Sequence, residues 1–165
     1  MNIVVAYDER GAIGKNNELL WNFGDLKADK ERFLGLTLYH TVAMGRKTLE
    51  SIGGPLKNRR TIVLSRSLKV TSGFEVARSL EEVADMTTED GPVYLIGGEQ
   101  IYREALSKKL VHTIFATEVM VTFSEADAFF PRDELSDGWY EEDRISYAAD
   151  NDNKYDCDFV TYEHR

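Results

Sequence analysis

The feature that most constrains the fold of this chain is the alternation of short, strongly apolar segments with longer amphipathic ones. Brief apolar segments bounded by Gly, Asn, Ser or charged residues are typical of strands that are buried on both faces of a sheet. The pattern predicts such strands at Ile3–Tyr7, Thr41–Met44, Thr61–Leu64, Phe74–Ala77, Pro92–Ile96 and Thr113–Thr117.

Helical spacing of apolar residues occupies several of the gaps between these strands. It predicts helices over Asp25–Leu38, Ser79–Met86 and Glu99–Leu106. The second of these begins with Ser79 and has Glu82 three residues later, which is a capping box. Strands that alternate with helices indicate a mainly parallel sheet with helices on its faces.

The C-terminal region has a different pattern. Trp139–Tyr147 and Tyr155–His164 are two alternating stretches separated by a polar segment, which is the pattern of a hairpin. No repeat or proline-rich linker divides the 165 residues, which suffice for one domain. We therefore predict a single α/β domain with a mainly parallel central sheet of about eight strands, flanked by helices and closed by an antiparallel C-terminal hairpin.

Charge and composition exclude several classes of protein. The chain carries 29 Asp and Glu residues against 20 Lys and Arg, a formal net charge of −9, which argues against general nucleic-acid binding. No apolar run reaches the roughly 18 residues of a membrane span, and the N-terminus lacks the basic flank of a signal peptide. Cys157 is the single cysteine, so no intramolecular disulfide is possible. We expect a cytoplasmic protein with no membrane or nucleic-acid partner and no bound metal.

Glycines and cations follow three of the predicted strands. Gly97-Gly98 leads from one strand into a helix, Gly45–Thr48 does so with two cations, and Ser65-Arg66 ends a third strand. Ligands of open α/β sheets bind beyond the carboxyl ends of strands, so this shared placement indicates an anion site. Taken alone, the glycine pair is more typical of a tight turn than of a phosphate site, and any single cation is as often ordinary surface.

Two acidic residues draw attention on the first predicted helix. Asp25 and Asp29 are four residues apart and share a face, and Phe33 follows Asp29 by one turn. Taken by themselves, both carboxylates are typical of a helix cap or of solvated surface. An acid beside an aromatic ring in a binding site would suit a flat, protonatable heterocycle. The loop before this helix, residues 11–21, is of a kind that forms lids in some proteins and plain connections in most.

Together these residues resemble the dihydrofolate reductase family over nearly the whole chain. The resemblance rests, in order, on Ala6, Ile13-Gly14, Leu20-Trp21, Asp29, Phe33, Thr37, Val42–Thr48, Glu50–Gly53, Pro55-Leu56, Arg59, Ile62–Arg66, Ile96–Gly98, Tyr102, Asp127 and Phe130-Pro131. Each piece is weak alone, and their combination is specific. The positions that depart from the usual pattern of the family are Leu20, Leu49, Gln100 and Ala128.

The resemblance implies a site for dihydrofolate. Asp29 would hydrogen-bond the amidine edge of the pterin with support from Thr117, and Trp21 would complete the catalytic set. Arg59 would bind the α-carboxylate of the glutamate tail, a bidentate task that suits Arg. Phe33 would pack on the pterin. The substrate-binding residues implied in this way are Val4, Val5, Ala6, Phe33, Ile52, Leu56, Arg59, Ile96 and Tyr102.

The resemblance also implies NADPH as the cofactor. Gly97 and Gly98 would lie against its pyrophosphate and nicotinamide, while Ser65 and Arg66 would bind the 2′-phosphate and favour NADPH over NADH. Residues 40–90 would roughly form an adenosine-binding subdomain. The cofactor-binding residues implied in this way are Ala6, Ile13, Gly14, Gly45, Arg46, Lys47, Thr48, Leu64, Ser65, Arg66, Gly97 and Gly98.

Family spacing gives two answers for the position of the acid. Counted from Trp21, the usual spacing favours Asp25; counted back from Phe33 and from the end of the next strand, it favours Asp29. The downstream register is unbroken, so we expect Asp29 to be the acid, with a longer loop before it. Asp25 is then expected to cap the helix.

The implied reaction is the NADPH-dependent reduction of 7,8-dihydrofolate to 5,6,7,8-tetrahydrofolate, with hydride transfer to C6 and protonation at N5. Such an enzyme would serve one-carbon metabolism, would be an antifolate target and is expected to be a monomer. One alternative is a reductase of the same fold that acts on a ribosylated pyrimidine in flavin synthesis. Another is a non-catalytic nucleotide-binding module, which would bind NADPH without turnover.

Overall fold

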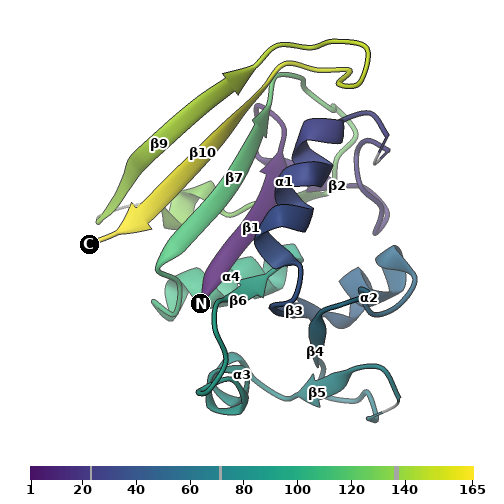
Figure 1. Cartoon of the computed structure of the whole chain (residues 1–165), viewed down its shortest axis with the longest axis vertical. Helices are drawn as coiled ribbons and strands as arrows, with labels where there is room; N and C mark the ends of the chain where they lie inside the picture. The colour runs from purple at the N-terminus through teal and green to yellow at the C-terminus, as the bar shows by residue number, and fades with distance from the viewer. Residues whose placement is uncertain (23, 71, 136–137) are drawn as a thin grey trace.

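The computed structural model describes residues 1–22, 24–70, 72–135 and 138–165. The strands of its main sheet are β1 (Asn2–Tyr7), β3 (Thr41–Gly45), β4 (Arg60–Leu64), β5 (Glu75–Ala77), β6 (Val93–Leu95), β7 (Thr113–Val119), β9 (Trp139–Tyr147) and β10 (Cys157–His164). The helices are α1 (Lys27–Thr37), α2 (Arg46–Ile52), α3 (Leu80–Met86) and α4 (Glu99–Ser107), and a 3-10 turn follows at Arg132–Glu134. Figure 1 shows how these elements are arranged.

The sheet has eight strands in the order β5-β4-β3-β6-β1-β7-β10-β9. The first six of these run parallel, and β10 pairs antiparallel with both β7 and β9. The predicted fold class is therefore confirmed. Sequence patterns did not point to a second, two-stranded sheet formed by β2 (Ala12–Gly14) and β8 (Ala128–Phe129). These strands have two or three residues each, too few for a periodic pattern to be visible.

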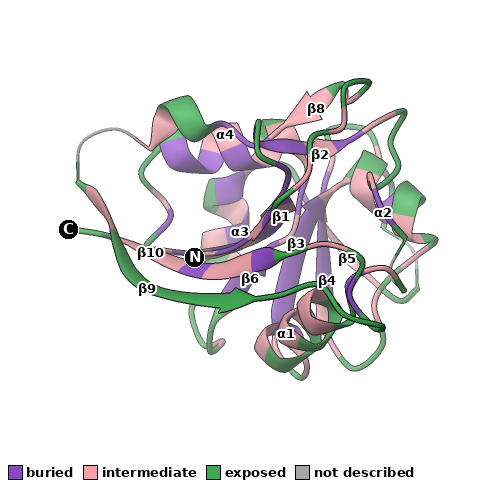
Figure 2. Ribbon diagram, turned by 90° about the horizontal axis from the view of Figure 1, so that it is seen from above, coloured by how far each residue is buried: buried purple, intermediate pink, exposed green. Residues whose placement is uncertain are grey.

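Helices cover both faces of the main sheet, as Figure 2 shows. On one face, α3 and α4 pack on a core that includes Ile3, Leu95 and Ile114. On the other face lie α1 and α2, over a second core that includes Met44 and Val63. The central strands are thus buried on both sides, which explains their nearly continuous apolar sequences. Within the described residues, no helix is long and apolar enough to cross a membrane.

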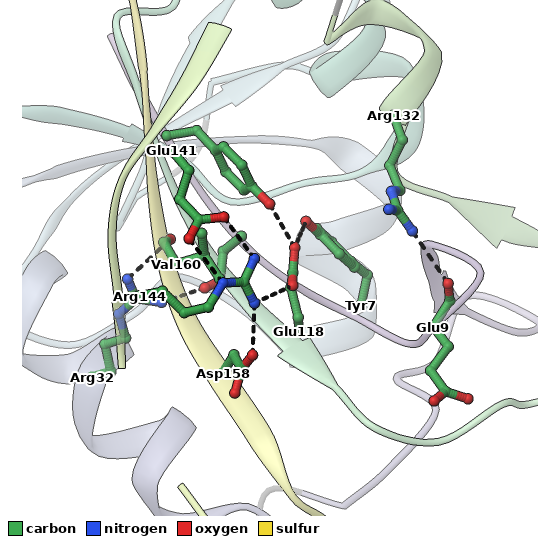
Figure 3. A network of polar contacts seen from close by, with 11 residues as sticks. Tyr7, Glu9, Arg32, Glu118, Arg132, Glu141, Arg144, Asp158 and Val160 are labelled. Carbon is green, nitrogen blue, oxygen red and sulfur yellow. Dashed lines mark hydrogen bonds and ion pairs between the residues drawn. The ribbon is translucent and has the colours of Figure 1, made fainter. Parts of the chain in front are cut away.

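The C-terminal hairpin forms the exposed edge of the sheet. Glu118 of β7 accepts hydrogen bonds from the hydroxyl groups of Tyr7, at 3.0 Å, and Tyr162, at 2.7 Å. Arg144 of β9 pairs with the same carboxylate at 2.8 Å and with Asp158 of β10 at 2.6 Å. Figure 3 shows this network, which ties the hairpin to the parallel part of the sheet.

The hairpin turn also caps helix α1. Leu26 occupies the N-cap position and has no side-chain acceptor to offer. Asn153 supplies one instead: its Oδ1 accepts a hydrogen bond from the Ala28 N–H at 2.8 Å, across 125 positions of sequence. Asp150 Oδ1 accepts from the Asn153 backbone N–H and side-chain amide, at 2.8 and 2.9 Å, and so fixes the amide. The start of the helix is therefore decided by a distant loop.

The expectation that Asp25 caps this helix is wrong. Asp25 lies before the first residue of α1, and the one hydrogen bond that its carboxylate accepts from the described residues is a long one, 3.3 Å, from the Asn22 N–H. Its carbonyl accepts from the Lys154 N–H at 2.7 Å, so the hairpin turn again holds this segment. A local acid is displaced from the capping role because Asn153 already occupies it.

Asn153→Ala should lower the free energy of unfolding by about 1–2 kcal/mol, because a helix N–H loses its acceptor in a buried place. Urea unfolding followed by circular dichroism measures the difference. Asn151→Ala, in the same turn but at an exposed position, is the matched control and should change stability by less than about 0.5 kcal/mol. Equal effects of the two substitutions would show that Asn153 does not cap α1.

Candidate active site

Asp29 lies in the first turn of α1 and faces β7. The Thr117 hydroxyl on that strand donates a hydrogen bond to Asp29 Oδ1 at 2.6 Å. Thr117 is buried, whereas Asp29 is half-buried. Burial raises the pKa of Asp29, while the hydrogen bond from Thr117 and the charge of Arg32 act to lower it. The structure therefore brings together two of the predicted catalytic residues, and it leaves Asp25 outside the contact.

Arg59 is hydrogen-bonded to the C-terminal end of α1. Its Nε donates to Thr37 Oγ1 and its Nη1 to the Lys57 carbonyl, each at 2.9 Å, and the guanidinium lies 5.8 Å from the centre of the Phe33 ring. Its Nη2 is buried and has no hydrogen-bond partner among the described residues. Buried donors are rarely left unpaired, so this nitrogen is suited to an anionic group of a ligand.

Thr37 supports Arg59, a role that was not predicted. The Thr37 hydroxyl accepts from Arg59 and donates to the Phe33 carbonyl at 2.8 Å, so one side chain links the arginine to the helix. The signal in the sequence was the spacing of four residues between Phe33 and Thr37, which places both on one face of the helix.

Two glycine segments meet at the carboxyl ends of β3 and β6. The Gly45 N–H donates to the Gly97 carbonyl at 2.8 Å. Gly97 has a φ of +134°, and a Cβ there would lie 3.2 Å from Thr48 Oγ1 and 3.6 Å from the Tyr102 hydroxyl. A side chain would therefore be both strained and crowded. The positive φ and the contact with Thr48 explain why glycine stands here, at the carboxyl ends of parallel strands where dinucleotides bind in α/β proteins.

The predicted cations after β3 and β4 are exposed, and one of them already has an acidic partner. Arg46 forms an ion pair with Glu50, one turn later, at 2.8 Å, and Arg66 is exposed in the loop after β4. Arg78, which was not predicted, follows β5 and donates to the Ser65 carbonyl at 2.6 Å. Its position directly after the strand predicted at residues 74–77 was the signal that could have identified it. Lys47 is also exposed.

The loop before α1 is joined to the segment after β7. The Asn16 N–H donates to Asp127 Oδ2 at 3.0 Å, and the Asp127 N–H donates to the Gly14 carbonyl at 3.0 Å. Trp21 is buried, and its ring lies 6.0 Å from that of Phe123. A cavity of about 410 Å³ remains between residues 15–20 and 122–126. The loop is thus joined to the segment after β7, and the cavity lies between the two segments.

The other predicted residues lie on both sides of the sheet. Val4 and Ala6 pack toward the α1 face, whereas the Val5 side chain lies in the core under α3 and α4, so only its backbone can serve the site. Tyr102 comes from that side too, and its hydroxyl donates to the Val4 carbonyl at 2.9 Å. The α1-side core takes in Ile52, Leu56 and Ile96, and the opposite core takes in Ile13 and Leu64.

Chemically, this arrangement combines three capabilities. A half-buried carboxylate with a hydroxyl beside it can hold the donor edge of a flat ring. An arginine nitrogen without a partner can bind an anionic tail. Glycine backbone at the ends of parallel strands can accept a phosphate-bearing ligand.

The family model described as dihydrofolate reductase matches residues 1–164 of the chain. The chain is 39% identical to dihydrofolate reductase type 3 of Salmonella typhimurium over 98% of its own length and 96% of that protein. It is 36% identical to dihydrofolate reductase of Haemophilus influenzae over 96% of its own length and 95% of that protein. A solved structure of dihydrofolate reductase from Enterococcus faecalis, complexed with NADP(H) and RAB-propyl, superposes with a TM-score of 0.88 at 32% identity and covers 99% of this chain and 95% of that one.

Asp29→Asn should stabilise the folded protein at neutral pH. Burial raises the folded-state pKa of Asp29 above its ordinary value of 3.8, so the folded state binds this proton more tightly than the unfolded chain. The stabilisation that this tighter proton binding gives is present below pH 3.8 and is lost as pH rises through the folded-state pKa of Asp29. The gain from Asp29→Asn should therefore appear at neutral pH and vanish in acid.

Urea unfolding at both pH values measures this difference. Asp25→Asn is the control, because Asp25 lies outside the contact with Thr117. A loss of stability in Asp29→Asn at neutral pH would contradict the expectation.

Proposed function

Because this chain belongs to the dihydrofolate reductase family, and is therefore an NADPH-dependent oxidoreductase that reduces 7,8-dihydrofolate to 5,6,7,8-tetrahydrofolate, we propose that the residues gathered around Asp29 form its active site. The observation that carries this assignment is the 2.6 Å hydrogen bond from Thr117 to Asp29. It holds one half-buried acid at the face of the sheet. The pyrimidine reductase of flavin synthesis is not favoured, because the family model matches nearly the whole chain.

We propose that Asp29 accepts hydrogen bonds from the amidine edge of the pterin, with Thr117 keeping the carboxylate in place. Phe33, one turn along the helix, would pack on the ring system, and Ile52 and Leu56 would line the space for the aminobenzoyl group. The unpaired Nη2 of Arg59 would complete its hydrogen bonding with the α-carboxylate of the tail. The length of α1 would thus set the separation between the two ends of the substrate.

For the cofactor, the glycine cluster supports the proposal. Gly97 and Gly98 follow β6 at the carboxyl end of a parallel strand, which is where a nicotinamide dinucleotide would bind. Ser65 and Arg66 would bind the 2′-phosphate, and we add Arg78 because it donates to the Ser65 carbonyl. Residues 40–90, which include β3 to β5, would form the adenosine-binding subdomain.

When bound, NADPH supplies a hydride to C6 of dihydrofolate, and N5 gains a proton. The chain would contribute orientation of the two rings and the charge of Asp29, which raises the proton affinity of the bound pterin. Water admitted beneath the loop 13–21 would deliver the proton.

We also propose that the protein is a cytoplasmic monomer that binds neither membranes nor nucleic acid. The edges of the sheet support the monomer: β5 has three residues, and β9 carries four consecutive charged residues, 141–144. Short and charged edge strands resist pairing with a second copy. Light scattering should give a molar mass near 18.8 kDa.

Oxidation of NADPH in the presence of 7,8-dihydrofolate is the direct test of the reaction. We expect turnover that methotrexate inhibits, and a lower kcat/KM when NADH replaces NADPH. Asp29→Asn should lose most of the hydride-transfer rate at neutral pH, because the anionic partner of the pterin is gone. Well-folded protein with no dihydrofolate-dependent oxidation would overturn the reaction, and full hydride transfer in Asp29→Asn would overturn the role of Asp29.

Arg59→Lys should raise KM for dihydrofolate by about 10- to 100-fold, because a charge-assisted, bidentate contact is lost. Both kcat and the Kd of NADPH should change little. Lys57→Ala is the matched control: it removes a neighbouring positive charge and keeps the carbonyl that Arg59 uses. An unchanged KM in Arg59→Lys, or an equal rise in Lys57→Ala, would contradict tail binding by Arg59.

A further inference from the structure

Arg32 of α1 is a half-buried cation that is held between two strands. Its Nη1 donates to the Ala116 carbonyl of β7 at 2.6 Å, and its Nη2 to the Val160 carbonyl of β10 at 3.3 Å. The guanidinium also lies 4.6 Å from the centre of the Phe159 ring. Figure 3 shows the side chain directed at Val160. Arg32 has no role in the proposed binding of substrate or cofactor.

No carboxylate neutralises this guanidinium at close range. Within the described ranges, Arg32 forms no ion pair of 4.0 Å or less. Carbonyl oxygens and an aromatic face hold the group without cancelling its charge. Arg32 therefore keeps a full positive charge in a place where solvent screening is reduced.

Asp29 lies three residues earlier on the same face of α1. The two side chains also share a strand, because Arg32 binds the carbonyl of Ala116 and Asp29 binds the hydroxyl of the next residue, Thr117. Arg32 is thus placed both to act on the Asp29 carboxylate through space and to hold the peptide that carries its hydrogen-bond donor.

Few other charged groups face this pair. Cys157 of β10 interacts with both residues, but burial raises the pKa of its thiol to about 11, so it is uncharged at neutral pH. Asp143 and Tyr147 of β9 interact with Arg32. Both lie on the exposed edge strand, where water screens them more strongly.

We propose that Arg32 is the positioning residue that keeps the Asp29 carboxylate charged and directed at the substrate. This inference rests on the proposed role of Asp29. Without a nearby cation, burial favours the protonated acid, which would give up a charge-assisted hydrogen bond to the pterin. Arg32 offsets that effect from within the protein, so the site keeps a charged acid before the substrate arrives.

Arg32→Lys and Arg32→Met separate charge from packing. Both replacements keep a long apolar stem and both lose the planar fork that reaches two carbonyls at once, whereas Lys alone keeps the charge. The titration of Asp29 is followed by NMR in protein labelled with [13C]aspartate, and Asp29→Asn assigns the resonance. Bound NADP+ stabilises each folded variant by mass action.

We expect the midpoint of the Asp29 titration to rise by about one pH unit in Arg32→Met, because a charge beyond direct contact is removed. In Arg32→Lys it should stay close to wild type. Arg32→Gln is a second neutral variant if Arg32→Met does not fold. An unchanged midpoint in a folded neutral variant, or equal rises in Arg32→Met and Arg32→Lys, would overturn the proposal.

Arg144→Gln is the control for general destabilisation of the hairpin. Arg144 is paired with Val160 in the sheet register, and Phe159 next to it contacts Arg32, so alternation places Arg144 on the opposite face. This variant should lose stability and leave the Asp29 midpoint unchanged. A shift as large as that of Arg32→Met would assign the effect to the fold and overturn the specific role of Arg32.

Enzyme kinetics give a second readout. The ratio of kcat/KM for dihydrofolate in Arg32→Met to that in wild type should rise by about tenfold from acid to alkaline pH, as Asp29 regains its charge. A ratio that is low and constant with pH would contradict the proposal. The NMR titration needs no turnover, so it tests Arg32 even if Asp29→Asn proves fully active and the role of Asp29 fails.

Discussion

The rest of the site depends on how a single carboxylate is held against the sheet. The hydrogen bond from Thr117 to Asp29 joins residues 88 positions apart, and it requires α1 and β7 to be in fixed register. Two parts of the fold meet that requirement. Pairing with β1 and β10 on either side holds β7, and Asn153 holds the first turn of α1. A displacement of either element would leave a partly buried charge without its partner, which is costly.

The hairpin therefore does more than close the sheet. Asn153 in its turn caps the helix that carries Asp29, and its strand β10 supplies the Val160 carbonyl that holds Arg32. On its opposite face, the network of Glu118, Arg144 and Asp158 fastens it to β7. Two of the acidic residues of the chain, Glu118 and Asp158, form ion pairs in that network. Arg59, which is assigned to the substrate tail, lies outside that network and keeps one donor, Nη2, without a partner among the described residues.

Much of the fold could be predicted because each strand has a local signature. Central strands are buried on both faces, so their apolar segments are continuous, and the strand predicted at 139–147 matches β9. The pair β2 and β8 was not predicted, because segments of two or three residues are too short to show a periodic pattern of apolar residues. In the site, the glycines that follow predicted strands indicated where a ligand would bind. Arg32 was not identified, because nothing nearby in sequence distinguishes a cation that binds strand carbonyls from one in solvent. Arg78 was missed although it directly follows a predicted strand.

The two acids before and within α1 show where prediction from sequence ends. Hydrophobic periodicity and turn residues by themselves determined the α/β class, the parallel sheet and the hairpin, since these follow from the local pattern of burial. Asp25 and Asp29 share one helix face, and only the family spacing to Phe33 favoured Asp29. Only the tertiary structure decided that Asp29 meets Thr117 and that Asp25 does not cap the helix. The physical reason is that a cap and a buried carboxylate both need partners, and here Asn153 and Thr117 supply them from distant parts of the chain.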